Sequence, residues 1–199
     1  SPNVARDFIK VPIEGDVLED TFHGAFAQSG GRVIIAGSRG VVINNAVSQS
    51  PDVEFAGVQE DIIAATANLQ EFFITTKNGE IFSSIDGSSW SGWKSAPGVL
   101  VNSIASSESV VIAAGNDGLI LIGIDGILYK RKIPTDANIM DILYDGKKFV
   151  AVTDNGEILI SFNGLYWEVQ NKNPDRKYFK ISYADSFYSL LSRGNKVVI

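Results

Sequence analysis

The sequence predicts an all-β fold made of five repeated units, each a four-stranded antiparallel sheet. A glycine turn followed at once by a short apolar strand recurs at intervals of 39, 39, 38 and 38 residues: Gly40, Gly79, Gly118, Gly156 and Gly194. Apolar residues come in runs or alternate with a period of two, which is typical of strands, and no segment has convincing helical spacing. Because five such periods fill nearly all of the 199 residues, the repeat is the fold.

The second unit shows the four strands most clearly. The expected strands are an apolar run at 61–66, a β-branched and aromatic segment at 72–76, and two further short segments at 80–84 and 89–93, with tight turns between them. Asn78-Gly79 and Asp86-Gly87 suit two of these turns because both dipeptides accept positive φ at little steric cost. The third and fourth units align with the second almost without gaps. Two further columns result, one of glycines and one of aromatic residues: Gly87, Gly126 and Gly164, and Trp90, Tyr129 and Trp167.

The first strand of each unit has its own apolar column, which we expect to pack between neighbouring sheets. Its members are Ala25, Ile63, Ile104, Ile142 and Ile181. Since side chains alternate along a strand, the residues beside this column are expected to line a central channel. These are Gly24, Ile62, Ser103, Asp141 and Lys180. Asp141 and Lys180 belong to adjacent units, so we expect a structural ion pair between them.

The first and last units depart from the pattern. In the first unit, residues 49–51 replace the second glycine turn, and in the fifth unit the strands 178–183, 187–192 and 196–199 lack a fourth partner. A spare strand-like segment at 6–13 precedes the first unit. Pairing it beside 196–199 completes the fifth unit, removes two exposed edges, and puts Phe8 in the aromatic column.

Four-stranded antiparallel units in this number are typical of a β-propeller, and the alternative is an open array of β repeats. We expect one domain over residues 1–199, a five-bladed propeller whose ring is closed by the N-terminal strand. The expected blades are 22–58, 59–97, 98–135, 136–173 and 174–199, with the closing strand at 6–13.

Composition excludes several functional classes. A net charge of −6 argues against a nucleic-acid partner, because phosphate binding needs clustered Lys and Arg. The absence of cysteine excludes disulfides, thiolate metal sites and a cysteine nucleophile. No stretch approaches the ~18 apolar residues that a membrane helix needs. His23 is the only histidine and has no second histidine for a metal, so we expect neither a metal site nor a cofactor.

Two hairpins, Ser84 to Trp90 and Ser161 to Trp167, resemble the Asp-box of sialidase-like and related bacterial or phage propeller repeats. The resemblance implies that Asp and Gly shape a tight turn while the aromatic residue packs between blades. It also implies an extracellular or virion-associated protein, such as an adhesin or a phage virion component. Sialidase chemistry needs three clustered arginines, and only Arg39 and Arg193 occupy equivalent turns, so we do not expect it.

A binding surface is expected where turns between second and third strands share a face with the connections between blades. Loops held by a rigid ring are the usual place for recognition. The candidate ligand-binding residues are Arg39, Lys77, Asp117, Asn155, Arg193 and Tyr178, and Asp141 and Lys180 are the candidate channel-lining residues. The loops 15–21 and 172–177 are the longest and most charged, which places the expected site near the junction of the fifth and first blades.

The function these residues predict is non-enzymatic recognition of a glycan or a protein surface. One alternative is a glycoside hydrolase using Asp20, Glu60 or Asp61, and Asp141 at the channel mouth, because such enzymes place two carboxylates ~5 to 9.5 Å apart. A second alternative is a purely structural component of an assembly. The hydrolase is disfavoured because blades of this length spare few residues for a pocket.

Overall fold

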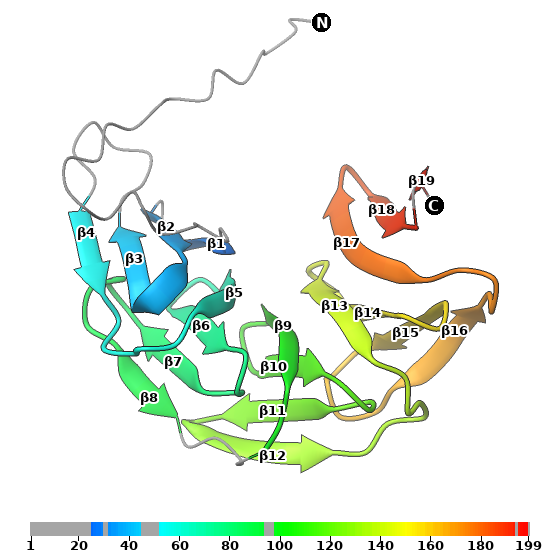
Figure 1. Cartoon of the computed structure of the whole chain (residues 1–199), viewed down its shortest axis with the longest axis horizontal. Coiled ribbons are helices and arrows are strands. Elements are labelled where there is room, and N and C mark those ends of the chain that lie inside the picture. Colours follow the sequence, from blue (N-terminus) through cyan, green and yellow to red (C-terminus); the bar gives the residue numbers. More distant parts are fainter. Residues whose placement is uncertain (1–24, 30–31, 45–51, 94–97, 194, 199) are drawn as a thin grey trace, which may run out of the picture.

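The computed structural model describes residues 25–29, 32–44, 52–93, 98–193 and 195–198, and these form five antiparallel sheets along an arc (Figure 1). We call the sheets blades 1 to 5. Blade 1 contains β1 (Ala25–Ser29), β2 (Arg32–Ala36), β3 (Val41–Asn44) and β4 (Asp52–Phe55). Blade 2 contains β5 (Ile62–Ala67), β6 (Phe72–Thr76), β7 (Ile81–Ser84) and β8 (Ser91–Trp93). Blade 3 contains β9 (Val101–Ser106), β10 (Val111–Gly115), β11 (Ile120–Ile124) and β12 (Ile127–Arg131).

Blades 4 and 5 complete the arc. Blade 4 contains β13 (Ile139–Tyr144), β14 (Phe149–Thr153), β15 (Glu157–Ser161) and β16 (Glu168–Lys172), and blade 5 contains β17 (Tyr178–Ala184), β18 (Phe187–Ser192) and β19 (Asn195–Val198). In every blade the strands pair in sequence order, and β1, β5, β9, β13 and β17 form the inner side of the arc (Figure 1). The all-β prediction and the four-stranded antiparallel unit are thus confirmed for blades 1 to 4.

Blade 5 differs because its described part has three strands, with β19 outermost. The expected closing strand at 6–13 lies outside the described residues. Blades 1 and 5 are the two ends of the arc, and β1 and β17 lie apart across its open side (Figure 1). The five-bladed closed ring therefore stays a prediction.

Apolar side chains pack between neighbouring blades because each strand alternates between its two faces. Between blades 3 and 4, Ile112 and Ile122 meet Phe149, Leu159 and Trp167, all of them at most 9% exposed. Similar clusters fill the space between blades 1 and 2 and between blades 2 and 3. At ~25 cal/mol per Å² of buried apolar surface, these interfaces supply the main stabilisation of the arc.

A β-bulge in the inner strands corrects two of the sequence-based assignments. Ile62 and Tyr178 lie at the start of their strands, directly before the register shift, and pair with Thr76 and Ser192. Both are buried, at 0% and 5% exposure. Ile62 therefore does not line the channel, and Ala64 holds the position equivalent to Asp141. Tyr178 is a core residue and does not offer its ring to a ligand.

The Asp-box-like hairpins have matching hydrogen bonds in blades 2 and 4. Ser161 Oγ accepts from Gly164 N at 2.9 Å, as Ser84 Oγ accepts from Gly87 N at 2.8 Å. The indole N–H of Trp167 donates to Gly164 O at 3.0 Å, and that of Trp90 to Gly87 O at 3.1 Å. The hairpins are therefore structural turns.

The expected aromatic column is incomplete at the third blade. Tyr129 is 53% exposed on β12 and does not pack between blades. The aromatic residue that packs between blades 2 and 3 is instead Trp93, whose ring lies edge-on to Phe73 with centroids 5.6 Å apart. Any residue larger than glycine at position 123 would clash with Trp93, because its Cβ would lie 2.4 Å from the Trp93 ring. Glycine on β11 therefore makes room for the tryptophan.

Candidate functional site

The turns between second and third strands and the connections between blades lie on the same face of the arc, as the sequence predicts. Backbone hydrogen bonds join the two kinds of loop in successive blades. Ala56 N donates to Gly40 O at 2.8 Å, Gly118 N to Ala137 O at 2.9 Å, and Asn173 N to Gly156 O at 2.8 Å. We call this surface the loop face. Both ends of each loop continue into strands of the sheets, so the loops are held in fixed positions on this face.

A buried carboxylate, Glu157, ties the loops of blades 3 and 4 to this platform. It is 4% exposed, accepts from the Thr135 hydroxyl, and pairs with Lys172 Nζ at 2.8 Å. Burial alone raises the pKa of Glu157, but the hydrogen bonds from Lys172 and Thr135 outweigh it and leave the pKa below the ordinary 4.5. Glu157 is therefore ionised near neutral pH and holds Lys172 at the start of the loop that follows.

That loop, Asn173 to Lys177, has a defined shape. Arg176 N donates to Asn173 O at 3.0 Å, and Asp175 N donates to the Asn173 side-chain oxygen at 3.2 Å. Gly156 lies directly beneath with φ of +81°, and a Cβ there would lie 1.8 Å from the Asn173 carbonyl oxygen. Glycine in the blade 4 turn is thus required for the loop of blade 5 to sit where it does.

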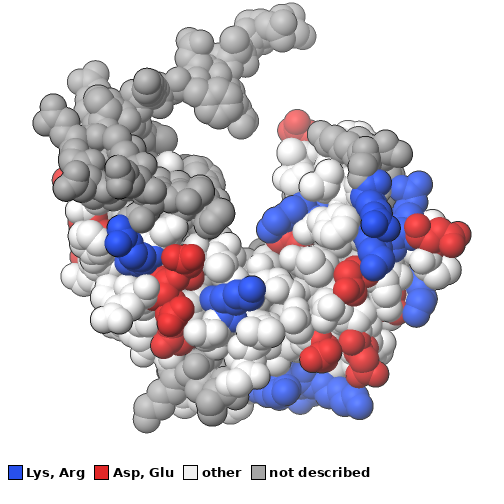
Figure 2. Space-filling view, viewed as in Figure 1, with Lys and Arg blue, Asp and Glu red and all other residues white. Residues whose placement is uncertain are grey.

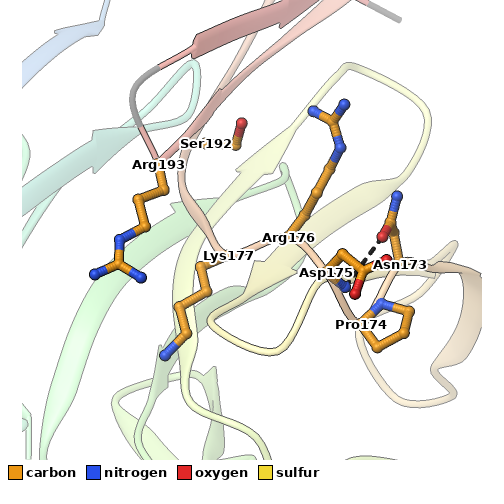
Figure 3. Close-up of a pocket in the computed structure, with 7 residues that line it drawn as sticks. All are labelled: Asn173, Pro174, Asp175, Arg176, Lys177, Ser192 and Arg193. Atoms are coloured by element: carbon orange, nitrogen blue, oxygen red, sulfur yellow. Dashed lines mark hydrogen bonds between the residues drawn. The ribbon is translucent and has the colours of Figure 1, made fainter.

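A pocket of about 500 Å³ opens between this loop and the end of β18, and we call it the cationic pocket. Its lining residues are Asn173, Pro174, Asp175, Arg176, Lys177, Ser192 and Arg193. Lys177 and Arg193 extend to the same side, whereas Arg176 points away from them (Figure 3). Figure 2 shows Lys and Arg gathered over blade 5, while over blade 2 they alternate with acidic residues.

The three cations of the pocket are available to a ligand. No hydrogen bond or ion pair joins the side chain of Arg176, Lys177 or Arg193 to any other residue in the part of the chain that the structure describes. Asp175 is the one carboxylate lining the pocket, so cations outnumber it there. In a chain of net charge −6, such a local excess of positive charge attracts anionic groups.

The other predicted ligand residues are spread along the loop face. Arg39, Lys77, Asp117 and Asn155 are all exposed, each in the turn of a different blade. Arg39 and Asp117 adopt φ of 52° and 54°, and their backbone N–H groups donate to Asp61 and Asn138. Arg193 is the only predicted ligand residue that lines the cationic pocket. The loop 172–177 was expected from the sequence to be near the site, but Arg176 and Lys177 were not among the predicted ligand residues, although two adjacent basic residues at a break in the repeat are a usable signal.

The channel-side carboxylate Asp141 is fully engaged in structure. It is 7% exposed, accepts from Ser103 Oγ at 2.6 Å and from Ile181 N at 3.0 Å, and lies 3.6 Å from Lys180 Nζ. The expected ion pair between Asp141 and Lys180 is therefore present. Its hydrogen bonds join the inner strands of blades 3, 4 and 5.

The carboxylates of the hydrolase alternative do not converge in a described pocket. Asp61 and Glu60 are exposed, Asp61 accepts from Arg39 N at 3.1 Å, and Asp20 lies outside the described residues. Within the described ranges no group of three or more His, Asp or Glu is arranged to hold a metal ion. The same ranges contain no helix long and apolar enough to cross a membrane.

Comparison with known proteins supports the fold. No model of a known protein family matches the sequence, and neither does any curated protein. Among solved structures, YCF48 bound to D1 peptide matches with a TM-score of 0.71 at 14% identity over 94% of this chain and 66% of that one. The structure of YCF48 from Cyanidioschyzon merolae matches with a TM-score of 0.64 at 10% identity over 84% of this chain and 65% of that one.

A third match is the WD40 β-propeller domain of Doa1, with a TM-score of 0.65 at 11% identity over 83% of this chain and 60% of that one. The chain thus spans 60% to 66% of the length of these three neighbours. At such identities the likeness concerns architecture alone. The blades, their strand order and these matches together identify the fold as a β-propeller.

Proposed function

We propose that this propeller is a protein-recognition module that binds an acidic peptide segment in the cationic pocket of its loop face. The observation that carries the proposal is the set of three cationic residues, Arg176, Lys177 and Arg193, that line about 500 Å³ of open space and whose side chains have no described partner. Arg and Lys pair with carboxylates through charge-assisted hydrogen bonds, which are about twice as strong as neutral ones.

The shape of the pocket favours an extended peptide over a small molecule. The space is bounded by one loop and the end of one strand, and it opens onto the loop face. An enclosed cavity typical of small-molecule sites is not formed by these residues. YCF48, whose fold is similar, was solved with a bound peptide, which agrees with peptide binding by propellers of this kind.

A glycan ligand has less support. The aromatic ring expected to contact it, Tyr178, is buried, and no aromatic side chain lines the cationic pocket. Sugar sites generally pair an exposed aromatic face with polar groups. The adhesin and virion contexts, which rest on the Asp-box resemblance, stay predictions.

Binding of short labelled peptides, measured by fluorescence anisotropy, tests the proposal. The panel contains an acidic decapeptide and its Gln/Asn counterpart, with a set of neutral glycans in parallel. The test variant is Lys177→Gln/Arg193→Gln. The control variant, Lys130→Gln/Lys132→Gln, removes the same charge from two exposed residues of blade 3, one in β12 and one directly after it.

We expect the wild-type protein to prefer the acidic peptide and to bind it more weakly as salt rises. The test variant should lose at least about tenfold in affinity, since hydrogen bonds to charged groups contribute about 1.5 to 3 kcal/mol each. The control variant should bind as the wild type does. Equal losses in both variants would indicate diffuse attraction, and binding of a glycan without any peptide preference would contradict the proposal.

A further inference from the structure

An apolar cavity of about 320 Å³ lies between blades 4 and 5, away from the cationic pocket. Blade 4 contributes Val150, Ile158 and Ile160 to its wall, and blade 5 contributes Tyr188 and Leu190. The space is a groove that opens to solvent beside the exposed residues Gln170 and Asn171, so the described residues leave its apolar wall uncovered.

The interface between blades 3 and 4 shows what occupies the same place elsewhere in the molecule. Phe149 of β14 contacts Tyr144 on one side and Trp167 on the other, with ring centroids 4.8 and 6.5 Å apart. Trp167 immediately precedes the fourth strand of its blade and is 9% exposed. Together these rings fill the outer part of the interface.

Strand register identifies the matching positions in blade 5. Tyr188 pairs with Tyr183 as Phe149 pairs with Tyr144, and the Tyr183 and Tyr188 rings lie 4.9 Å apart. Two of the three aromatic rings are thus repeated. The third position, held by Trp167 in blade 4, has no counterpart among the described residues of blade 5, and the cavity lies beside Tyr188 where that side chain belongs.

We propose that the outer edge of β19, which pairs with no other described strand, and this cavity accept residues 6–13 of the same chain as the fourth strand of blade 5, with Phe8 in the cavity. The segment Phe8-Ile9-Lys10-Val11-Pro12-Ile13 combines an aromatic residue with β-branched residues, which favour strands. The only proline lies near one end of the segment, where a strand tolerates it.

The length of the connecting chain agrees with this occupant. In the described structure, five to seven residues connect the last strand of one blade to the first strand of the next. Eleven residues, 14–24, separate the segment from β1. Since an extended chain of that length reaches roughly 36 Å, pairing with β19 does not require blades 1 and 5 to be in contact.

Register also predicts which residues pair across the new ladder. In blade 4, Ile160 of β15 lies opposite Glu168, the residue after Trp167. Ser189 of blade 5 is equivalent to Val150 of blade 4, because each follows the aromatic residue compared above. Ser189 pairs with Val198 and Val150 pairs with Ile160, so Val198 is equivalent to Ile160. Ile9, the residue after Phe8, should therefore lie opposite Val198. Lys10 should point to the other face.

Engineered disulfides test this register cleanly, because the chain has no cysteine of its own. The test pair is Ile9→Cys with Val198→Cys, and the matched control is Lys10→Cys with Val198→Cys. Directly opposite residues in antiparallel strands come within disulfide geometry, whereas residues on opposite faces do not. Both full-length variants are oxidised at low protein concentration, and the products are separated by non-reducing electrophoresis.

We expect the test pair to form an intramolecular disulfide rapidly and almost completely, and the control pair to form it slowly. Equal rates in the two pairs, or no crosslink at all, would overturn the proposal. Covalent dimers from the test pair would also overturn it, because the strand would then come from a second copy.

A separate measurement tests the cavity. Phe8→Ala should lower the melting temperature, whereas Val4→Ala, outside the proposed strand, should not. If the test pair crosslinks but Phe8→Ala leaves the melting temperature unchanged, the assignment of Phe8 to the cavity is wrong.

Discussion

The interface between blades 3 and 4 and the interface between blades 4 and 5 have the same strand pairing but differ in how they are filled. The first is closed by Phe149 and Trp167. The second leaves about 320 Å³ beside Tyr188, whose hydroxyl donates to Asp145 at the rim. Lys148 lies over the Tyr188 ring, 5.5 Å from its centroid, and pairs with Asp145 at 3.3 Å.

This difference separates the part of the molecule that follows the repeat from the part that departs from it. Blade 4 follows the repeat and packs closely on its neighbour. Blade 5 departs from it, and it contributes both the cationic pocket and the unfilled cavity. Features that distinguish this propeller from a plain repeat array thus gather at one end of the arc.

The largest expected effect comes from removing the ring that closes the first interface. Trp167→Ala should lower the free energy of unfolding by about 3 to 5 kcal/mol, because it opens a cavity in a packed core. The neighbouring Tyr166 is 72% exposed and its ring contacts only the Arg131 guanidinium, 5.7 Å from its centroid, among the described aromatic and cation–π contacts, so Tyr166→Ala should cost at most about 1 kcal/mol. Urea unfolding of both variants checks the prediction. Similar losses in the two would mean that Trp167 does not close the interface.

The second largest expected effect comes from substituting Gly156, the glycine in the blade 4 turn that supports the loop of the cationic pocket. Gly156→Ala should cost about 2 to 4 kcal/mol, because the new Cβ meets the Asn173 carbonyl and the backbone is left-handed. Gly126 has a similar φ of +78° with nothing near a Cβ, so Gly126→Ala should cost only about 1 kcal/mol. Gly156→Ala should also weaken acidic-peptide binding, and Gly126→Ala should not. A Gly156→Ala protein with unchanged stability and affinity would show that the loop does not depend on this turn.

The smallest effect concerns the polar rim of the second interface. Burial, and then the hydrogen bond to Asp145, raise the pKa of Tyr188 above its ordinary 10.0. Folded Tyr188 therefore keeps its proton where the unfolded chain releases it, so its stabilising contribution is present below about pH 10 and declines as pH rises through the folded pKa.

Tyr188→Phe removes both the hydrogen bond and the ionisable group. It should cost about 1 kcal/mol at neutral pH and reduce the loss of stability above pH 10. Denaturant unfolding at pH 7, 9 and 10.5 measures both effects. An alkaline decline that is equally steep in the variant would assign that decline to other groups.

The sequence predicted the repeat and its turns well because both depend on local chemistry. The glycines of the turns and the alternating apolar strands mark each blade. The placement of Ile62 and Tyr178 was wrong because a β-bulge shifts the register of the inner strands, and no residue in the sequence marks it. The strand register places Tyr178 at the position of Ile139 and Ile62, which are both core residues.

The site was predicted only as a region. The charged break at 172–177 lies at the end of the arc that contains the cationic pocket, but the grouping of Arg176, Lys177 and Arg193 depends on how a blade 4 turn supports the loop before blade 5. Such a contact between distant segments leaves no local pattern. Tyr129 is a second example. Its spacing in the repeat predicted that it packs between blades, but the neighbouring blade does not cover it and it is 53% exposed.

Mapping a bound acidic peptide by backbone amide chemical shifts tests most directly that recognition lies at blade 5. Titration should shift the amides of residues 173, 175–177, 192 and 193 most strongly, and those of β12 on the outer edge of blade 3 very little. Strongest shifts on β12, or small shifts spread evenly over the molecule, would contradict the account.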